Sequence, residues 1–299
     1  MKRLSYSAIS ERLVEAERWL VSLGVIVSGE NRISRLILNV GRLAEAFGDG
    51  TLQELVDDGN QVELQWSLVE GLEFLEIFDG LRQMAPNRWK EKLVTALQGP
   101  IVPDEESADS NLGRNTMFEL NVGGRLTQKG ILVDLPQDNP DILCEINFRK
   151  IFLQCKRPFS ERGLPQIIRR AGMQLKRDLA GEESALGIAS ISVSRVRNSG
   201  DRIFVVGNER EGRRLLADDV QRLAERYKRD WDNLNSFHER IIGILFHIIT
   251  PAHVRDVNLL VAAQQTVMCP FSAPGTEERE LFGAFASAFL QPDEELEIN

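Results

Sequence analysis

Four polar residues in the middle of the chain have the types and spacing that metal-assisted hydrolysis requires. Glu119 lies in a segment expected to be helical, and Asp141 opens an apolar, strand-like run. Gln154 and Lys156 close a second such run, which begins after a tight turn. Side chains alternate along a strand, so these two share one face and Cys155 points to the other. Oxygen ligands could hold a hard cation that activates water, and a lysine could offset developing charge.

Two other acidic residues compete for the role of metal ligand. Asp134 lies on the strand expected before Asp141, and Glu145 shares a strand face with Asp141. An ion pair with Arg149 or Lys150 would explain Glu145 without any metal ion. The residue types therefore favour Asp141 and leave Asp134 as its main rival.

The order of these parts resembles the PD-(D/E)xK nuclease superfamily. An acid on a helix, a strand that opens at Pro140 and Asp141, and a paired strand that ends in Gln154 and Lys156 carry the likeness. The Gln-x-Lys ending is similar to that of the Mrr-type restriction branch, where it replaces the usual acid-x-Lys. The likeness has motif support over residues 113–195 and rests on the order of elements beyond them.

The resemblance implies a metal-dependent DNA endonuclease with Mg²⁺ or Mn²⁺ as its cofactor. By this likeness, Asp141 would be the bridging metal ligand and Gln154 would give a neutral amide oxygen. The backbone carbonyl of Cys155 would be a further ligand, and Glu119 would complete the metal shell or orient a water. Lys156 would be the catalytic lysine.

The glutamine at position 154 also supports an alternative, because it removes one carboxylate from the site. The alternative is a catalytically silent nuclease-fold protein that binds nucleic acid or scaffolds a complex. A second alternative is a structural or regulatory protein whose α/β part is unrelated to nucleases.

Basic residues gather next to the candidate site, although the net charge of the chain is −9. Between residues 149 and 178 there are nine basic and two acidic residues. A local basic stretch in an acidic protein indicates a confined phosphate-binding surface, and a solvated helix face is the plainer interpretation. The candidate DNA contacts are Arg157, Arg162, Arg169, Arg170 and Gln174. A surface ion pair explains Arg157 equally well, and an ordinary surface position explains Gln174.

The pattern of apolar residues predicts an α/β protein with a helical N-terminal domain. Helices are expected over 4–23, 33–47, 51–56, 62–84 and 86–97. Residues 1–98 would form this domain, and the acidic, proline-containing residues 99–112 would form a linker or exposed loop. Residues 113–299 would form a restriction endonuclease-like α/β/α core. Its later helices are expected over 164–179, 211–231 and 276–290, and its later strands over 185–196, 241–250 and 259–268.

Composition argues against several other classes of protein. No apolar run approaches roughly 18 residues and no apolar segment opens the chain, so we expect no membrane span, no signal peptide and a cytoplasmic location. The three cysteines have no C-x-x-C spacing, which argues against a disulfide framework or a zinc knuckle. The three histidines form no catalytic pattern, and no glycine-rich segment ends in G-K-[ST].

The predicted helical domain is strongly acidic in its middle part. Between residues 45 and 79 there are ten acidic residues and no basic one. Such a surface does not favour DNA. We therefore expect this domain to form a homodimer or to bind a protein partner, within a restriction or antiviral defence system.

Overall fold

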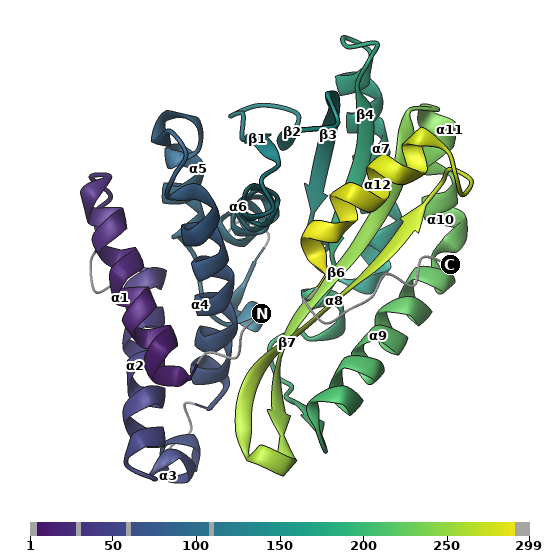
Figure 1. The fold of residues 1–299 in the computed structure, drawn as a ribbon. Helices are drawn as coiled ribbons and strands as arrows, with labels where there is room; N and C mark the ends of the chain where they lie inside the picture. The colour runs from purple at the N-terminus through teal and green to yellow at the C-terminus, as the bar shows by residue number, and fades with distance from the viewer. Residues whose placement is uncertain (1–4, 28–30, 58–60, 108–110, 291–299) are drawn as a thin grey trace.

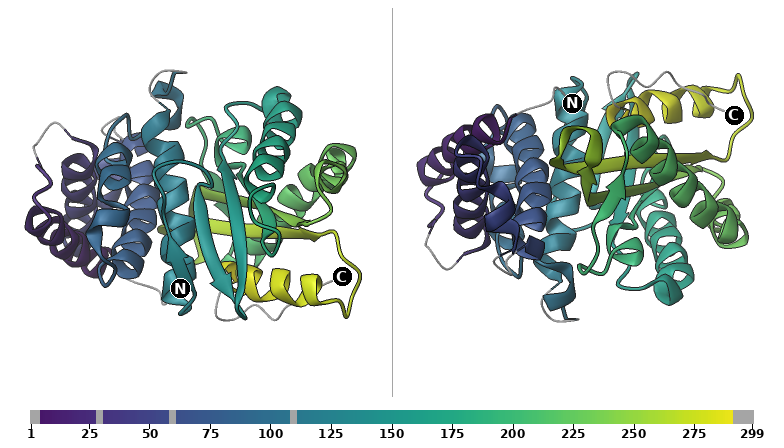
Figure 2. Two further views of the ribbon diagram at one scale, coloured as in Figure 1. Left: turned by 90° about the horizontal axis from the view of Figure 1, so that it is seen from above. Right: turned by 90° about the horizontal axis from the view of Figure 1, so that it is seen from below.

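Helices lie on both sides of a curled, mixed sheet in the computed structural model of the protein (Figure 1). The structure describes residues 5–27, 31–57, 61–107 and 111–290. Views from above and below show the N-terminal helices as layers beside the sheet (Figure 2). The prediction of a mixed α/β fold is confirmed. None of the helices in the described ranges is both long and apolar enough to cross a bilayer.

The described N-terminal part contains five α-helices. They are α1 (Tyr6–Ser22), α2 (Arg32–Gly48), α3 (Leu52–Asp57), α4 (Gln61–Leu81) and α5 (Lys90–Ala96). The Ser5 side chain caps α1 by accepting a hydrogen bond from the Ala8 amide, and Asn31 caps α2 through the amide of Ser34. Helix α4 is buried almost all round, as expected of a helix that is apolar on every side.

Seven strands form one sheet in the described ranges, in the order β1-β2-β3-β4-β6-β5, with β7 paired to β6. They are β1 (Leu132–Asp134), β2 (Ile142–Ile146), β3 (Arg149–Lys156), β4 (Leu186–Ser192), β5 (Phe204–Val206), β6 (Ile241–Val254) and β7 (Leu259–Pro270). Strands β1, β2 and β3 pair antiparallel, whereas β3, β4, β6 and β5 run parallel. Asn147 and Phe148, with φ of 50° and 62°, form the two-residue turn of the expected β2–β3 hairpin.

Helices cover both faces of this sheet. Helices α6 (Leu112–Gln128) and α12 (Glu277–Ala286) lie on the face toward the N-terminal helices. The opposite face carries α7 (Leu164–Leu179), α9 (Glu209–Arg226), α10 (Lys228–Asp232) and α11 (Leu234–Phe237).

Several elements end earlier than their apolar patterns predict, and hydrogen bonds account for two of these differences. The strand expected over 185–196 stops at Ser192, and a short helix α8 (Ser194–Arg197) follows. The Ser194 hydroxyl accepts a hydrogen bond from the Ile249 amide on β6, which turns the chain out of the sheet. The helix expected over 211–231 breaks near Tyr227, and Trp231 Nε1 donates to the Ala224 carbonyl that the break leaves free.

One apolar core joins the N-terminal helices to the near face of the sheet. It runs from residues such as Leu13 and Leu36 to Ile142 on β2. The expected exposure of residues 99–112 is wrong for their first half, because Ile101 and Val102 are buried in this core. Residues 108–110 of the predicted linker lie outside the described residues.

Helices α4 and α6 cross with their backbones in contact. A Cβ atom added at Gly80 would lie 2.3 Å from the Gly124 carbonyl oxygen, closer than real atoms approach. The absence of a side chain at Gly80 therefore fixes how deeply α6 packs against the N-terminal helices. Because α6 carries Glu119, this crossing also sets the position of that carboxylate.

Gly80→Ala is expected to lower the free energy of unfolding by about 1–3 kcal/mol, because the new methyl group meets backbone atoms that cannot move aside. Gly48→Ala is the matched control, since a Cβ there would have no neighbour within 4 Å. The control should be neutral or stabilising by up to about 1 kcal/mol, in line with helix propensity. Urea unfolding measures both variants, and equal effects would contradict the close crossing.

Candidate active site

Lys156 lies in the middle of a cluster of oxygen atoms at the end of β3. Its Nζ is 2.8 Å from Asp141 Oδ2, 2.7 Å from Gln154 Oε1 and 3.1 Å from the Cys155 carbonyl oxygen. The structure thus gathers three of the four proposed metal-binding groups around one ammonium.

The β2–β3 hairpin brings Asp141 to this point. Ile142, the first residue of β2, pairs with Leu153 of β3. Asp141 therefore lies beside the end of β3, where its Oδ2 accepts a hydrogen bond from the Cys155 amide at 2.7 Å as well as from Lys156. The register of one hairpin, and not any longer-range packing, sets this part of the site.

The Gln154 side chain is fully buried and held in one orientation. Its Nε2 donates to Asp178 Oδ2 at 2.8 Å and to Asn139 Oδ1 at 3.3 Å, so its Oε1 faces Lys156. Burial raises the pKa of the Asp178 carboxyl, and the hydrogen bond from Gln154 acts in the opposite direction. Asp178 was not predicted from the sequence. The available signal was its position as the one acid in the otherwise basic helix α7.

Glu119 reaches the cluster through a lysine of the N-terminal helices. Lys92 Nζ on α5 donates to Glu119 Oε2 and to the Asp141 carbonyl oxygen, each at 2.9 Å. Both side chains are largely buried, 10% exposed for Lys92 and 18% for Glu119. Burial raises the pKa of Glu119, while Lys92 lowers it and Asp141 raises it further. Nothing in the sequence distinguishes Lys92 from its neighbour Lys90.

The atoms of the cluster are hard oxygen donors. Asp141 and Glu119 supply two carboxylates, Gln154 an amide oxygen and Cys155 a main-chain carbonyl. In the described ranges no group of three or more His, Cys, Asp or Glu side chains could hold a metal ion. This set nevertheless fits Mg²⁺, which is bound in proteins by one or two carboxylates together with water and substrate oxygens. The position of the Lys156 ammonium among three of these oxygens supports that fit.

Asp134 and Glu145, the two alternative metal ligands, lie away from Lys156. Asp134 Oδ1 is 3.3 Å from Arg88 and accepts a hydrogen bond from the Leu135 amide. Glu145 lies opposite Lys150 in the hairpin, four residues from Asp141 along β2. The two basic residues suggested as its partners bind other acids: Arg149 binds Glu277 at 3.1 Å and Lys150 binds Glu182 at 2.8 Å. Neither rival contacts Lys156.

The candidate DNA contacts divide into exposed and buried residues. Arg162, Arg169 and Arg170 are exposed on and just before α7. Gln174 is half-buried, and its Oε1 has no hydrogen-bond partner among the described residues. Arg157 is a buried ion-pair partner and not a surface contact. Its side chain is 7% exposed and binds Glu106 at 2.6 Å.

A comparison with protein-family models, curated proteins and solved structures finds no significant match. The nuclease hypothesis therefore depends on the residues and the geometry of this chain.

Lys92→Met is expected to lower the free energy of unfolding by about 1–3 kcal/mol near neutral pH, because it removes the cation beside a buried carboxylate. This loss should shrink as the pH falls, because burial raises the pKa of Glu119 and the protonated form needs no cation. Urea unfolding at several pH values measures it. Lys90→Met, at the first residue of α5, is the control and should change stability by less than about 0.5 kcal/mol.

The double variant Lys92→Met/Glu119→Gln should recover part of this loss, because it leaves no buried charge without a partner. An unchanged cost of Lys92→Met in the Glu119→Gln background would show that the two side chains are not energetically coupled.

Proposed function

We propose that the protein is a metal-dependent endonuclease that hydrolyses DNA phosphodiester bonds and has a restriction endonuclease-like core. One observation carries this proposal: Asp141, Gln154 and the Cys155 carbonyl surround Lys156 at the end of a hairpin, with Glu119 bridged to them. The types of these residues and their order along the chain are the features by which the chain resembles the PD-(D/E)xK nucleases.

The proposed metal ligands are Asp141, Glu119, the Gln154 amide oxygen and the Cys155 carbonyl. Bound there, Mg²⁺ or Mn²⁺ would polarise the phosphate and lower the pKa of a coordinated water. Lys156 would offset the negative charge that develops on the phosphate oxygens, because its ammonium lies among the same groups. Hydrogen bonds to Asp141 from the Cys155 amide and from Lys156 hold that carboxylate in place.

Asp178 offers an explanation for a glutamine at position 154. The negative charge that an acid would bring there lies instead on Asp178, one hydrogen bond away from the Gln154 amide. A carboxylate that accepts from the amide nitrogen polarises the amide and makes its oxygen a better cation ligand. The substitution is therefore compatible with metal binding.

The surroundings of the site suit a DNA substrate. The exposed Arg162, Arg169 and Arg170 belong to the segment that follows β3 directly, where they could bind the DNA backbone. A cytoplasmic protein that acts in restriction or phage defence is the setting we infer from the nuclease likeness. A homodimer, or a partner bound through the N-terminal helices, would supply the second site that a double-strand cut needs.

One observation favours the alternative of a catalytically silent nuclease fold. Each carboxylate of the cluster already has a lysine partner, Lys156 for Asp141 and Lys92 for Glu119. A protein with this arrangement could keep the fold for nucleic-acid binding or scaffolding without cleaving its ligand.

The wild-type protein is expected to nick or linearise supercoiled plasmid with Mg²⁺ or Mn²⁺ and to stop when EDTA is added. Lys156→Met and Asp141→Asn should each lose about 100-fold or more of this activity, because they remove charge stabilisation or a metal ligand. Lys150→Met, on the same strand but paired with Glu182, is the control and should retain activity. Gel analysis of plasmid forms gives the rates.

Cleavage that survives both EDTA and Lys156→Met would contradict the proposed mechanism. A wild-type protein that retards DNA in a gel but never cuts it would favour the silent alternative.

A further inference from the structure

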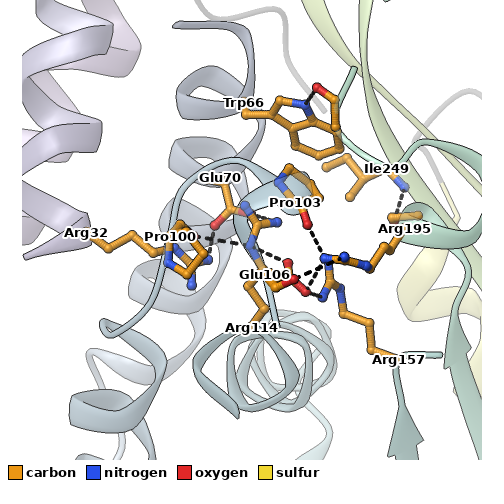
Figure 3. A network of polar contacts seen from close by, with 12 residues as sticks. Arg32, Trp66, Glu70, Pro100, Pro103, Glu106, Arg114, Arg157, Arg195 and Ile249 are labelled. Atoms are coloured by element: carbon orange, nitrogen blue, oxygen red, sulfur yellow. Dashed lines mark hydrogen bonds and ion pairs between the residues drawn. The ribbon is translucent and has the colours of Figure 1, made fainter. Parts of the chain in front are cut away.

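Arginine side chains gather where the N-terminal helices meet the sheet (Figure 3), and three of them line a cavity. Its water-accessible volume is about 20 Å³. Its charged walls are Arg32 from α2, Glu70 and Glu73 from α4, Arg114 from α6 and Arg157 just after β3. Residues of the candidate active site do not line it, so it is a separate feature.

Positive charge is in excess around this cavity. Four guanidinium groups share two buried carboxylates. Arg32 and Arg114 bind Glu70, and Arg114, Arg157 and Arg195 bind Glu106. Each of these six side chains is at most 7% exposed. Even when Glu73 on the cavity wall is counted as a third carboxylate, one positive charge remains without an opposite charge, and this favours a further anion.

Two guanidinium groups still have unused donors. Arg32 Nε and Arg114 Nη2 are buried and have no hydrogen-bond partner among the described residues. Both side chains line the cavity. A buried donor without an acceptor is rare in proteins, so each of these two donors indicates a place where a bound group could accept a hydrogen bond. Water would accept a hydrogen bond but would not balance the charge.

The other walls limit what can enter. Trp66, Met117, Phe118 and Ile249 make part of the lining apolar, and Ser192 adds a hydroxyl group. These walls favour a small, compact anion. Glu73 also faces the cavity; burial raises the pKa of its carboxyl, and Arg114 acts in the opposite direction.

We propose that this cavity binds a phosphate group, held by Arg32 and Arg114. Guanidinium groups recognise phosphate through paired N–H donors, and both arginines have a donor to spare. The group could be inorganic phosphate or the phosphate of a small nucleotide. This inference does not depend on the proposed nuclease activity, because it uses none of the residues of that site.

The cavity and the candidate active site are built from the same two elements. Arg114 and Glu119 lie on α6, and Arg157 directly follows Lys156. A ligand that fixes Arg114 and Arg157 would therefore stabilise the elements that hold Glu119 and Lys156. Ligand binding should protect the backbone amides of α6 and the end of β3 from hydrogen exchange.

Isothermal titration of the full chain with inorganic phosphate, at constant ionic strength in a chloride buffer, tests the proposal. One phosphate should bind per chain. Arg32→Met should weaken binding at least about tenfold, because it removes a buried donor and charge. Glu70 keeps Arg114 as its partner in this variant. Arg35→Met is the matched control on the same helix, where Arg35 pairs with Glu63 at 2.8 Å, and it should leave phosphate affinity unchanged.

Ser192→Val covers the case in which Arg32→Met does not fold, because it narrows the cavity without removing a charge. It should also weaken phosphate binding. Crystals soaked in selenate should show an anomalous peak within hydrogen-bond distance of Arg32 Nε and Arg114 Nη2. No saturable phosphate binding, together with no such peak, would overturn the proposal. Tighter binding of a nucleoside monophosphate than of phosphate would identify a nucleotide as the source of the group, and equal or weaker binding would identify free phosphate.

Discussion

The need to pair buried charges along α6 is the constraint on which the rest of the structure depends. This helix lies between the N-terminal helices and the sheet, yet it carries Arg114, Glu119 and Arg125. Each finds an opposite charge from another part of the chain: Glu70 and Glu106, Lys92, and Glu76, respectively. A buried charge that loses its partner costs about 3–5 kcal/mol. These pairs therefore fix the rotation and depth of α6, and the contact between Gly80 and Gly124 lets it pack closely enough to form them.

The candidate active site is a consequence of the same arrangement. The hairpin alone brings Asp141, Gln154 and Lys156 together, because these contacts follow from strand register. Glu119 and Lys92 arrive only when the N-terminal helices pack against α6 and the sheet. The part of the site that the hairpin builds thus forms locally. The part built by Glu119 and Lys92 connects the site to the helical region. Any partner that moved the N-terminal helices would change the charge around Glu119 first.

The two proposed binding sites share helix α6 and the end of strand β3. Lys156 and Arg157 are adjacent in sequence, but one holds an oxygen cluster and the other a buried carboxylate. The first site has oxygen atoms that surround a lysine ammonium, and the second has guanidinium donors without an acceptor among the described residues. The opposite chemistry of the two sites means that they select different ligands, although α6 contributes to both. An anion in the second site would reduce the cost of burying its guanidinium groups.

The sequence by itself determined the mixed α/β fold, the β2–β3 hairpin and the common face of Gln154 and Lys156. Each of these follows from local periodicity or turn chemistry, which act over a few residues. Tertiary structure decided the partners of buried polar and charged groups: Lys92 for Glu119, Asp178 for Gln154, and Glu106 for Arg157. It also decided that Ile101, Val102 and Glu106 are buried, although their polar, proline-containing segment is typical of an exposed linker. A charged residue is buried only if opposite charges from distant segments reach it, and no local pattern records which segments will meet.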